Sequence, residues 1–370
     1  MLTPNPHRSR PVTAWSVAVC ALLVAASSAL AQGTPKARYV VKFVDQQNYT
    51  HIHADTLYTH LGHNRGAPSG PQHDPARENI LTQFKAGYPD AFKHAFVKNS
   101  VTYYNVVAEL TGTVRPTDIY IIGGHYDSAN NPGADDDASG VAAVIEIADI
   151  LSQWTADATI RFIAFDAEEK GLWGSDAYAG EHAGENIRGM ISLDMIAYRG
   201  TAGNKARVYG RSSSDSVKIP LAQACLDYGG ITLTLGGQSD NSDHAPFEWR
   251  GKPACLLIEY SWTSNPNYHR PTDAVETPNY IDYPYAVALT KGTLGWLVDV
   301  AGVNPDSPLG DLNCDWEINN FDIDPFVLAL TNPAGYKQTF PNCDIMNGDI
   351  NGDGLVNNFD IDPFVKLLTP

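Results

Sequence analysis

A short buried strand that ends beside a histidine and an acidic loop constrains this chain more than any other stretch. Residues 118–122 are rich in β-branched and aromatic side chains, which is typical of a buried strand. A glycine pair ends the run, and His125 and Asp127 follow directly. Three consecutive aspartates at 135–137 then lead into 141–154, an apolar segment without proline that predicts a buried helix. Open α/β sheets place their sites at such junctions between a strand end and a helix start.

Strand-like and helix-like patterns alternate through the chain up to about residue 300. The expected strands are 104–110, 118–122, 159–165, 190–196, 207–209, 231–235 and 254–260, and the expected helices are 77–86, 141–154, 218–228 and 283–300. Such alternation predicts an α/β fold in which helices sandwich a mostly parallel, mixed sheet.

Two boundaries divide the chain. Residues 1–31 have the pattern of a removable secretion signal, with early arginines, an apolar run over 14–26 and a small-residue cleavage pattern at the end. The apolar run is shorter than the roughly 20 residues that span a bilayer, so we expect a secreted or extracytoplasmic protein without a membrane span after signal removal. Residues 302–308 contain two prolines and no apolar run, which predicts a linker between an α/β domain over 32–301 and a C-terminal module over 309–370.

The charge of the chain argues against one class of partner. The sequence has 42 acidic residues against 25 lysines and arginines, a formal net charge of −17. Nucleic-acid-binding proteins carry a basic surface, so no nucleic acid is expected as a partner. An excess of carboxylates instead suits a protein that binds cations.

The role of segment 32–103 stays open, because it is either an integral part of the domain or a piece that must be cleaved for activity. Residues 39–44 alternate in polarity and predict a strand. Five histidines follow in a polar stretch, and their irregular spacing and the glycine and proline content of 62–75 favour a solvated loop over a metal site. These histidines are His51, His53, His60, His63 and His73.

Four cysteines lie beyond the expected signal, and an exported chain permits disulfides among them. Three pairings are possible. We favour Cys225–Cys255 and Cys314–Cys343 because each pair lies within one predicted domain. Free buried thiols are the alternative.

The C-terminal module contains an internal repeat that predicts two calcium loops. Each copy has oxygen-bearing side chains at loop positions 1, 3, 5, 9 and 12, which is the spacing of an EF-hand loop. The expected calcium ligands are Asp311, Asn313, Asp315, Asn319 and Asp322 in the first copy and Asp349, Asn351, Asp353, Asn357 and Asp360 in the second. Position 6 is Gly354 in the second copy but Trp316 in the first, and position 12 is aspartate rather than glutamate in both. Two calcium ions would neutralise a module whose acids otherwise repel one another.

Candidate ligands for a different metal follow several strands of the α/β region. They are His125, the aspartate triplet, Glu168 with Glu169, Asp194, and the loop residue His269. Imidazole and carboxylate without thiolate suit zinc or a similar divalent ion in a catalytic site. Two adjacent glutamates permit a division of labour in which one binds metal and the other moves protons. Taken alone, the triplet is also compatible with an acidic, solvated loop.

At these residues the chain resembles the secreted two-zinc aminopeptidases and their relatives, the glutamate carboxypeptidase-like zinc exopeptidases. The resemblance covers about 104–300. It rests on five motifs in the expected order: GGHYDS at 123–128, PGADDDASG at 132–140, FDAEEKGLWGS at 165–175, SLDM at 192–195 and YHRPTDA at 268–274. One such motif is weak evidence, but five in order are specific.

The resemblance implies a site with two zinc ions. It implies that His125 and Asp194 hold one ion, that Glu169 and His269 hold the other, and that Asp136 bridges them.

The same resemblance implies an aminopeptidase that removes N-terminal residues from peptides with a metal-activated water. Glu168 would be the general base, Tyr268 a donor to the oxyanion, and Asp127 the group that orients His125. For Asp243 we expect a local hydrogen-bonding turn without a ligand role.

The C-terminal repeat resembles dockerin modules, which are paired calcium loops in small helical units that dock onto cohesin partners. This implies a cohesin-like or cell-surface protein as partner, although the insert 328–347 departs from the dockerin pattern. Two alternatives stay open for the whole chain. One is a glutaminyl cyclase-like zinc acyltransferase, and the other is a non-catalytic binding protein that acts through the repeat.

Overall fold

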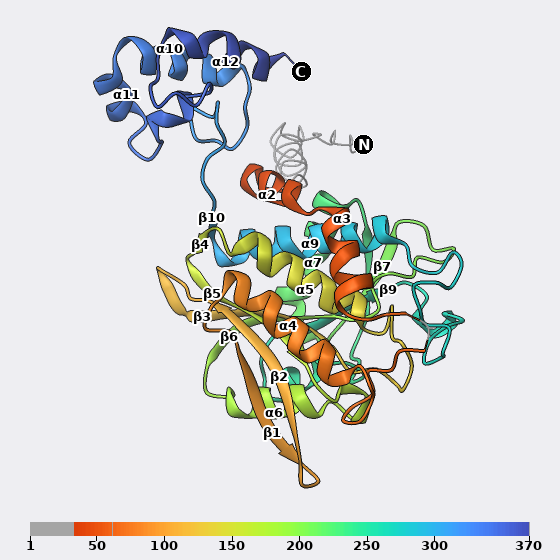
Figure 1. Ribbon diagram of the computed structural model, residues 1–370. Helices are drawn as coiled ribbons and strands as arrows, with labels where there is room; N and C mark the ends of the chain where they lie inside the picture. The colour runs from red at the N-terminus through yellow and green to blue at the C-terminus, as the bar shows by residue number, and fades with distance from the viewer. Residues whose placement is uncertain (1–32, 61, 370) are drawn as a thin grey trace, which may run out of the picture.

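The computed structural model describes residues 33–60 and 62–369, and shows an α/β domain followed by a small helical module (Figure 1). The expected signal at 1–31 lies outside the described residues. Within the described residues, no helix combines the length and the apolar character needed to cross a membrane.

The α/β domain is built on an eight-stranded mixed sheet with the order β1-β2-β5-β3-β6-β9-β7-β8. The strands are β1 (Phe92–Lys98), β2 (Val101–Leu110), β3 (Arg115–His125), β5 (Ala158–Phe165), β6 (Asn186–Leu193), β7 (Lys205–Tyr209), β8 (Thr232–Leu235) and β9 (Ala254–Glu259). The central pairs β5–β3, β3–β6 and β6–β9 are parallel, and so is β7–β8. The pairs β1–β2, β2–β5 and β7–β9 are antiparallel. The predicted α/β fold with a mostly parallel, mixed sheet is confirmed.

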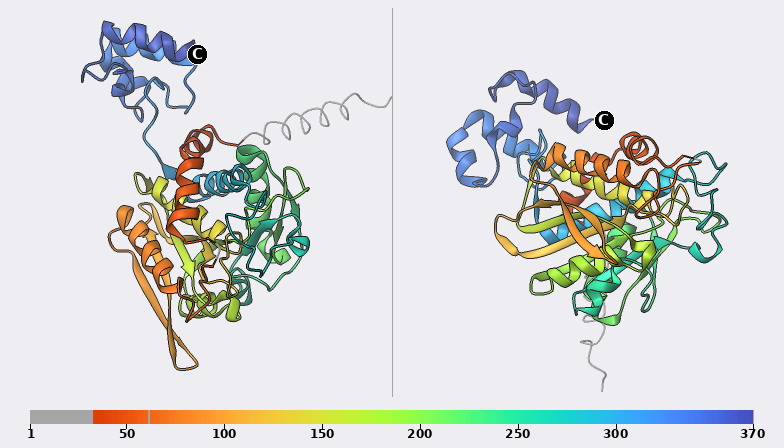
Figure 2. Two further views of the ribbon diagram at one scale, coloured as in Figure 1. Left: turned by 45° about the vertical axis from the view of Figure 1, so that its right-hand side comes forward. Right: turned by 60° about the horizontal axis from the view of Figure 1, so that its bottom comes forward.

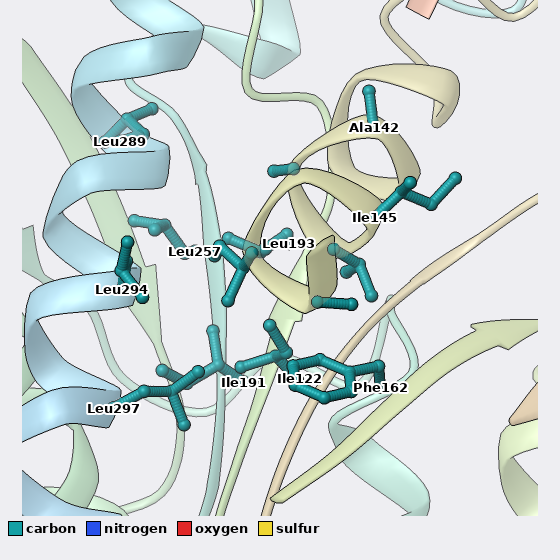
Figure 3. Packing of buried hydrophobic residues seen from close by; sticks show 14 of the residues in the cluster. Ile122, Ala142, Ile145, Phe162, Ile191, Leu193, Leu257, Leu289, Leu294 and Leu297 are labelled. Atoms are coloured by element: carbon teal, nitrogen blue, oxygen red, sulfur yellow. The ribbon is translucent and has the colours of Figure 1, made fainter. Parts of the chain in front are cut away.

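Helices cover both faces of this sheet (Figure 2). One face packs against α4 (His73–Gly87), α5 (Ala138–Leu151), α7 (Asp215–Gly229) and α9 (Tyr283–Ala301), and the other against α6 (Trp173–Glu181) and α8 (Ala245–Trp249). Every residue of α5 except Asp149 is buried, which explains why its sequence is almost entirely apolar. Figure 3 shows Ala142 and Ile145 of this helix above the sheet residues Ile122 and Phe162. Each fully buried leucine or isoleucine of such a core stabilises the fold by about 1.5–3 kcal/mol.

The predicted strand at 39–44 is wrong, because the segment is helical. It forms α2 (Pro35–Val40) and the 3₁₀ turn η1 (Val41–Phe43), and the side chain of Thr34 caps the helix start. The buried residues of the segment recur at the three- and four-residue spacing of a helix and join the main core: Ala37, Val40, Val41 and Val44.

The histidine-rich stretch has no helix or strand over 62–72, as expected of a loop, but its first part is helical and two of its histidines are buried. It contains α3 (Gln46–His51) and a π-helical turn over 52–56, and the side chains of His53 and His73 are buried. His53 Nε2 lies 2.5 Å from the carbonyl oxygen of Ala134, in the loop of the aspartate triplet. The described residues of 33–103 therefore pack as part of the α/β domain.

Two further sequence predictions are corrected. The linker at 302–308 begins inside the domain, because β10 (Val303–Asn304) pairs with β4 (Thr155–Ala156). Cys314 and Cys343 form the predicted disulfide, whereas Cys225 and Cys255 are free buried thiols. The Cys225 sulfur fills the space beside Gly292 of α9, where an added Cβ would come within 2.5 Å of it, so packing between α7 and α9 holds this thiol.

The C-terminal module has a core of its own. Its helices are α10 (Ile323–Thr331), α11 (Pro333–Thr339) and α12 (Ile361–Leu368). Phe326 and Phe364, which occupy the same position in the two repeat copies, stack with their centroids 4.2 Å apart. The two copies therefore pack against each other around equivalent residues.

Candidate metal centre

The candidate ligands lie at neighbouring strand ends of the sheet. His125 ends β3, Asp194 follows β6, and Glu169 lies in a 3₁₀ turn directly after β5. Asp136 lies in the loop before α5, and His269 in the loop after β9. Strands β5, β3, β6 and β9 are adjacent in the sheet, so their carboxyl ends meet at one edge, as expected for an open α/β sheet.

Asp136 stands at the centre of this group. Its Oδ1 lies 3.3 Å from His125 Nε2, and its Oδ2 lies 3.1 Å from His269 Nε2. His125 Nε2 is 3.8 Å from Asp194 Oδ1, and His269 Nε2 is 3.2 Å from Glu169 Oε2. The structure thus brings together all five side chains that the resemblance implies as zinc ligands.

The donor atoms fit a divalent metal. The oxygens Asp136 Oδ2 and Glu169 Oε1 are buried, and within the described residues neither takes part in a hydrogen bond. Such atoms are costly in a folded protein unless an ion or water satisfies them. Ligand atoms of Asp136, Glu169 and His269 all lie within 4.8 Å of one another. Imidazole and carboxylate donors without thiolate match zinc.

Asp137 also has an oxygen close to His125 and Asp194, but its carboxylate already serves the backbone. Its Oδ2 accepts the backbone N–H of His125 at 3.0 Å, and its Oδ1 accepts that of Gly140 at 2.9 Å as the cap of α5. An added Cβ at Gly140 would lie 2.1 Å from the Leu193 carbonyl oxygen, so only glycine permits α5 to start this close to β6.

The acidic triplet contains three carboxylates in different electrostatic states. Burial raises the pKa of Asp135 to about 7, and burial together with Asp194 raises the pKa of Asp137 well above its usual range. For Asp136, burial acts in the same direction, but the adjacent imidazoles of His125 and His269 outweigh it and lower the pKa. Among the three acids, Asp136 is therefore the one whose pKa is lowered by its neighbours.

Asp127 has a different set of contacts from the one the resemblance implies. Its carboxylate accepts the backbone N–H groups of Glu168, at 3.0 Å, and Glu169, at 3.3 Å. Its Oδ1 lies 3.6 Å from His125 Nδ1, whereas its carbonyl oxygen lies 3.2 Å from the same nitrogen. Asp127 therefore fixes the turn of the two glutamates and contacts His125 mainly through its backbone.

Glu168 and Tyr268 both line the cavity beside the five side chains. Burial raises the pKa of Glu168 well above its usual range, opposed by His125 and supported by Asp243 and Asp194. The ring of Tyr268 stacks on His269 with centroids 3.9 Å apart, and burial raises its pKa. Both groups can therefore hold a proton next to the candidate ligands.

The other wall of this cavity is apolar. The cavity is small, with a volume of about 90 Å³. The apolar and aromatic residues of the wall are Met195, Tyr209, Leu256, Ile258 and Trp262.

The expected turn at Asp243 is present in the backbone, where the N–H of Ala245 donates to the carbonyl of Ser242. The side chain of Asp243 takes no part in it. Among the described residues its two carboxylate oxygens have no hydrogen-bond partner, although the residue is fully buried.

Sequence reasoning missed three groups that hold the ligand loops. The buried guanidinium of Arg65 donates to the carbonyl oxygens of Tyr126, Pro132 and Gly133. His53 reaches Ala134, and Asp273 accepts the backbone N–H groups of Asp135 and Asp136. Only Asp273 had a sequence signal, as the acid of the YHRPTDA motif.

Fold and site together define a class: an α/β protein with a cluster of imidazoles and carboxylates, suited to divalent metal, at the carboxyl edge of its central strands. The chain belongs to peptidase family M28, whose model matches residues 105–289, half of the sequence.

Individual relatives agree with this assignment. The chain is 36% identical over 156 residues to a probable zinc metalloprotease of Pyrenophora teres f. teres (strain 0-1), covering 38% of this chain and 32% of that protein. It is 30% identical over 236 residues to leucine aminopeptidase 1 of Paracoccidioides brasiliensis (strain Pb03), covering 57% and 58%. The chain thus spans between about a third and three fifths of the curated relatives named here. The crystal structure of the Legionella pneumophila LapA aminopeptidase has the same fold, with a TM-score of 0.62 at 20% identity over 72% of this chain and 73% of that one.

Proposed function

We propose that this protein is an aminopeptidase that uses two zinc ions. The observation that carries the proposal is the position of Asp136, whose two carboxylate oxygens face two different histidines. His125 and Asp194 would hold one ion, Glu169 and His269 the other, and Asp136 would bridge them. The family and the printed names of the relatives support zinc and peptide hydrolysis.

When bound, the ions would supply electrophilic activation of a water and of the scissile carbonyl. Glu168 then accepts the proton of the attacking water and returns it to the leaving amine. Burial raises the pKa of this carboxyl group, which favours its acting first as proton acceptor and then as proton donor. Tyr268 donates a hydrogen bond from its hydroxyl group to the developing oxyanion, and Asp127 keeps Glu168 in place through the backbone.

The apolar wall supports an N-terminal residue with an apolar side chain as the preferred substrate. Burial of such a side chain against Leu256 and Ile258 would remove apolar surface from water on both partners. The printed name of one relative, leucine aminopeptidase 1, is consistent with this preference.

The decisive experiment combines zinc analysis with a substrate panel. Two zinc ions per chain and release of N-terminal amino acids, lost with a chelator, are expected. One zinc per chain with pyroglutamate formation would instead establish the glutaminyl cyclase alternative. Glu168→Gln should retain both ions and lose at least about 10²-fold in kcat, since a general base typically contributes that much. A wild-type protein with both ions and no turnover of any peptide would leave the non-catalytic alternative.

We also propose that module 309–370 binds two calcium ions. In both copies the carboxylate at loop position 12 accepts backbone N–H groups near the loop start, from Leu312 to Asp322 at 2.8 Å and from Ile350 to Asp360 at 2.9 Å. Burial raises the pKa of Asp311 to about 6, and the neighbouring acids act in the same direction. A bound cation would relieve that crowding. Calorimetric titration should find two calcium ions per wild-type chain. The variant Asp349→Asn should bind only one.

A protein partner for the module, cohesin-like or at a cell surface, remains part of this proposal. Each copy exposes an equivalent row of apolar side chains, which is the surface that protein partners bury. The rows are Phe321, Ile323 and Val327 in the first copy and Phe359, Ile361 and Val365 in the second. Export through the segment 1–31 also belongs to the proposal, and the N-terminal sequence of the secreted protein would test it.

A further inference from the structure

The two copies of the C-terminal repeat are identical over the nine residues from 319 and from 357, but their loops differ just before them. The second loop has Gly354 and an exposed leucine after it, whereas the first has Trp316 and Glu317. The backbone φ of Trp316 is 71°, a left-handed conformation that favours glycine. A large side chain kept at a position that disfavours it points to a contact that glycine cannot make.

That contact is with helix α2 of the α/β domain. The ring of Trp316 lies 5.8 Å from the ring of Tyr39, and the ammonium group of Lys36 lies 5.5 Å from the centre of the same indole. Arg38 Nη2 donates to Glu317 Oε1 at 2.9 Å. Two consecutive loop residues of the module therefore meet three residues of one helix, which lies on the side of the domain nearest the module in Figure 1.

The ring contact continues into the α/β domain. Tyr39 meets Phe43 at 5.4 Å between centroids, and Phe43 meets Trp154 at 5.2 Å. Trp154 follows α5, the helix that begins beside Asp136. The indole of Trp316 is thus the outermost of four rings that join the module to a core helix of the domain.

We propose that the first loop of the repeat, residues 311–322, is an intramolecular docking surface that holds the module against α2 through Trp316 and Glu317. The second loop has no equivalent side chains, and this explains why only the first copy departs from glycine at position 6. The exposed apolar rows of both copies remain outside the contact. Each contact is individually weak, so the docked state is in equilibrium with a released one.

Calcium should strengthen this docking, a step that depends on the calcium binding proposed above. Asp311 Oδ2 accepts the backbone N–H of Trp316 at 2.9 Å, and Asp311 Oδ1 accepts that of Asp315 at 3.2 Å. An ion held by Asp311 and Asp315 would fix the backbone from which the indole projects. Release of the ion would leave the indole less ordered.

The test uses the full-length protein and the variant Trp316→Gly. Glycine suits the positive φ, so the loop should fold and bind calcium at least as well as wild type. Loss of the ring and cation–π contacts should raise the released population about tenfold. Added protease should then cut the linker about tenfold faster within 305–308, and small-angle scattering should show a larger radius of gyration. Leu355→Ala removes an exposed apolar side chain from the second loop and should change neither quantity.

A charge exchange provides a second test. Arg38→Glu should release the module by repulsion from Glu317, and the double variant Arg38→Glu with Glu317→Arg should restore docking. Wild-type cleavage and scattering in Trp316→Gly, or no rescue in the double variant, would overturn the proposal. Chelation of calcium should release the module in wild-type protein, as the Trp316→Gly substitution does. Unchanged docking after chelation would overturn the proposed effect of calcium. If calorimetry finds no calcium, the calcium function fails, while the Trp316→Gly comparison still decides the docking.

Discussion

Asp273 accepts the backbone N–H of Asp135 at 2.7 Å, and by this contact the loop of His269 is tied to the loop of Asp136. The same carboxylate accepts the N–H of Asp136 at 3.3 Å and the hydroxyl of Tyr280 at 3.1 Å, and it is fully buried. One side chain therefore sets the separation between two loops that would share a zinc ion.

Asp273→Asn should weaken zinc binding. The amide keeps the shape of the carboxylate but turns an NH₂ group toward a backbone N–H, so one of the two contacts becomes repulsive. Loss of such support around metal ligands typically costs 10–100-fold in metal affinity or activity. Competition with a chelator would measure the affinity, and assays at saturating zinc would show how much activity returns.

The matched control is Asp344→Asn, because Asp344 also accepts a backbone N–H, from Met346, but lies in the C-terminal module. Its zinc affinity should equal that of wild type. Equal affinities in both variants would show that Asp273 does not position the ligand loops.

A second prediction concerns Arg65. This residue is 1% exposed, and its guanidinium donates hydrogen bonds to three carbonyl oxygens of the 126–133 loop. Arg65→Met keeps the stem but leaves these acceptors unsatisfied. An unsatisfied buried group costs about 1–3 kcal/mol, so the free energy of unfolding should fall by about 3 kcal/mol or more. Denaturant unfolding would measure it. Arg188→Met, at an exposed arginine, should change stability by less than about 0.5 kcal/mol.

The strands and helices of the α/β region followed from the sequence because period and burial agree there. α5 is almost entirely apolar and buried, and the motif residues His125 and Asp194 lie at strand ends as the pattern requires. At 39–44 the pattern misled, because Val41 and Phe43 flank Lys42 as in an alternating strand, whereas the residues that are buried, Val40, Val41 and Val44, have helical spacing. The predicted Cys225–Cys255 disulfide is wrong. That both cysteines belong to one domain does not determine how the chain packs around each sulfur.

The supporting groups of the site could not be predicted for a different reason. Arg65 and His53 bond backbone carbonyls 61 to 81 residues away. Because every residue has a backbone carbonyl, the sequence does not show which one is bonded. The same holds for Trp316, whose departure from glycine was visible although its partner Tyr39 was not. Ligands have motifs, whereas the groups that hold ligands are determined by tertiary contacts.

Stability below neutral pH should depend on His53. Burial lowers its pKa to about 4 from an ordinary value near 6.5, so the unfolded chain binds a proton that the folded one excludes. The group therefore stabilises the fold fully above pH 6.5, and this contribution is lost as the pH falls toward 4. At most about 3 kcal/mol should disappear over that interval.

His53→Gln should flatten this part of the pH profile, since glutamine does not titrate. Denaturant unfolding at pH 4.5 and pH 7.5 would compare the two proteins. His51→Gln changes an exposed histidine two residues away and should keep the wild-type slope. A wild-type slope in His53→Gln would show that other groups cause the acid instability.

Substrate preference should respond to Ile258. Leu256 and Ile258 are two residues apart on β9, so their side chains point to the same face, toward the candidate ligands. Ile258→Phe should fill part of the cavity and exclude large N-terminal side chains, while the small side chain of alanine still fits. The kcat/KM for leucyl and phenylalanyl substrates should then fall about 10–100-fold relative to that for an alanyl substrate, the range that a change in pocket shape commonly gives. Thermal unfolding of the same variant would detect overpacking, and an equal fall for all three substrates would place the specificity pocket elsewhere.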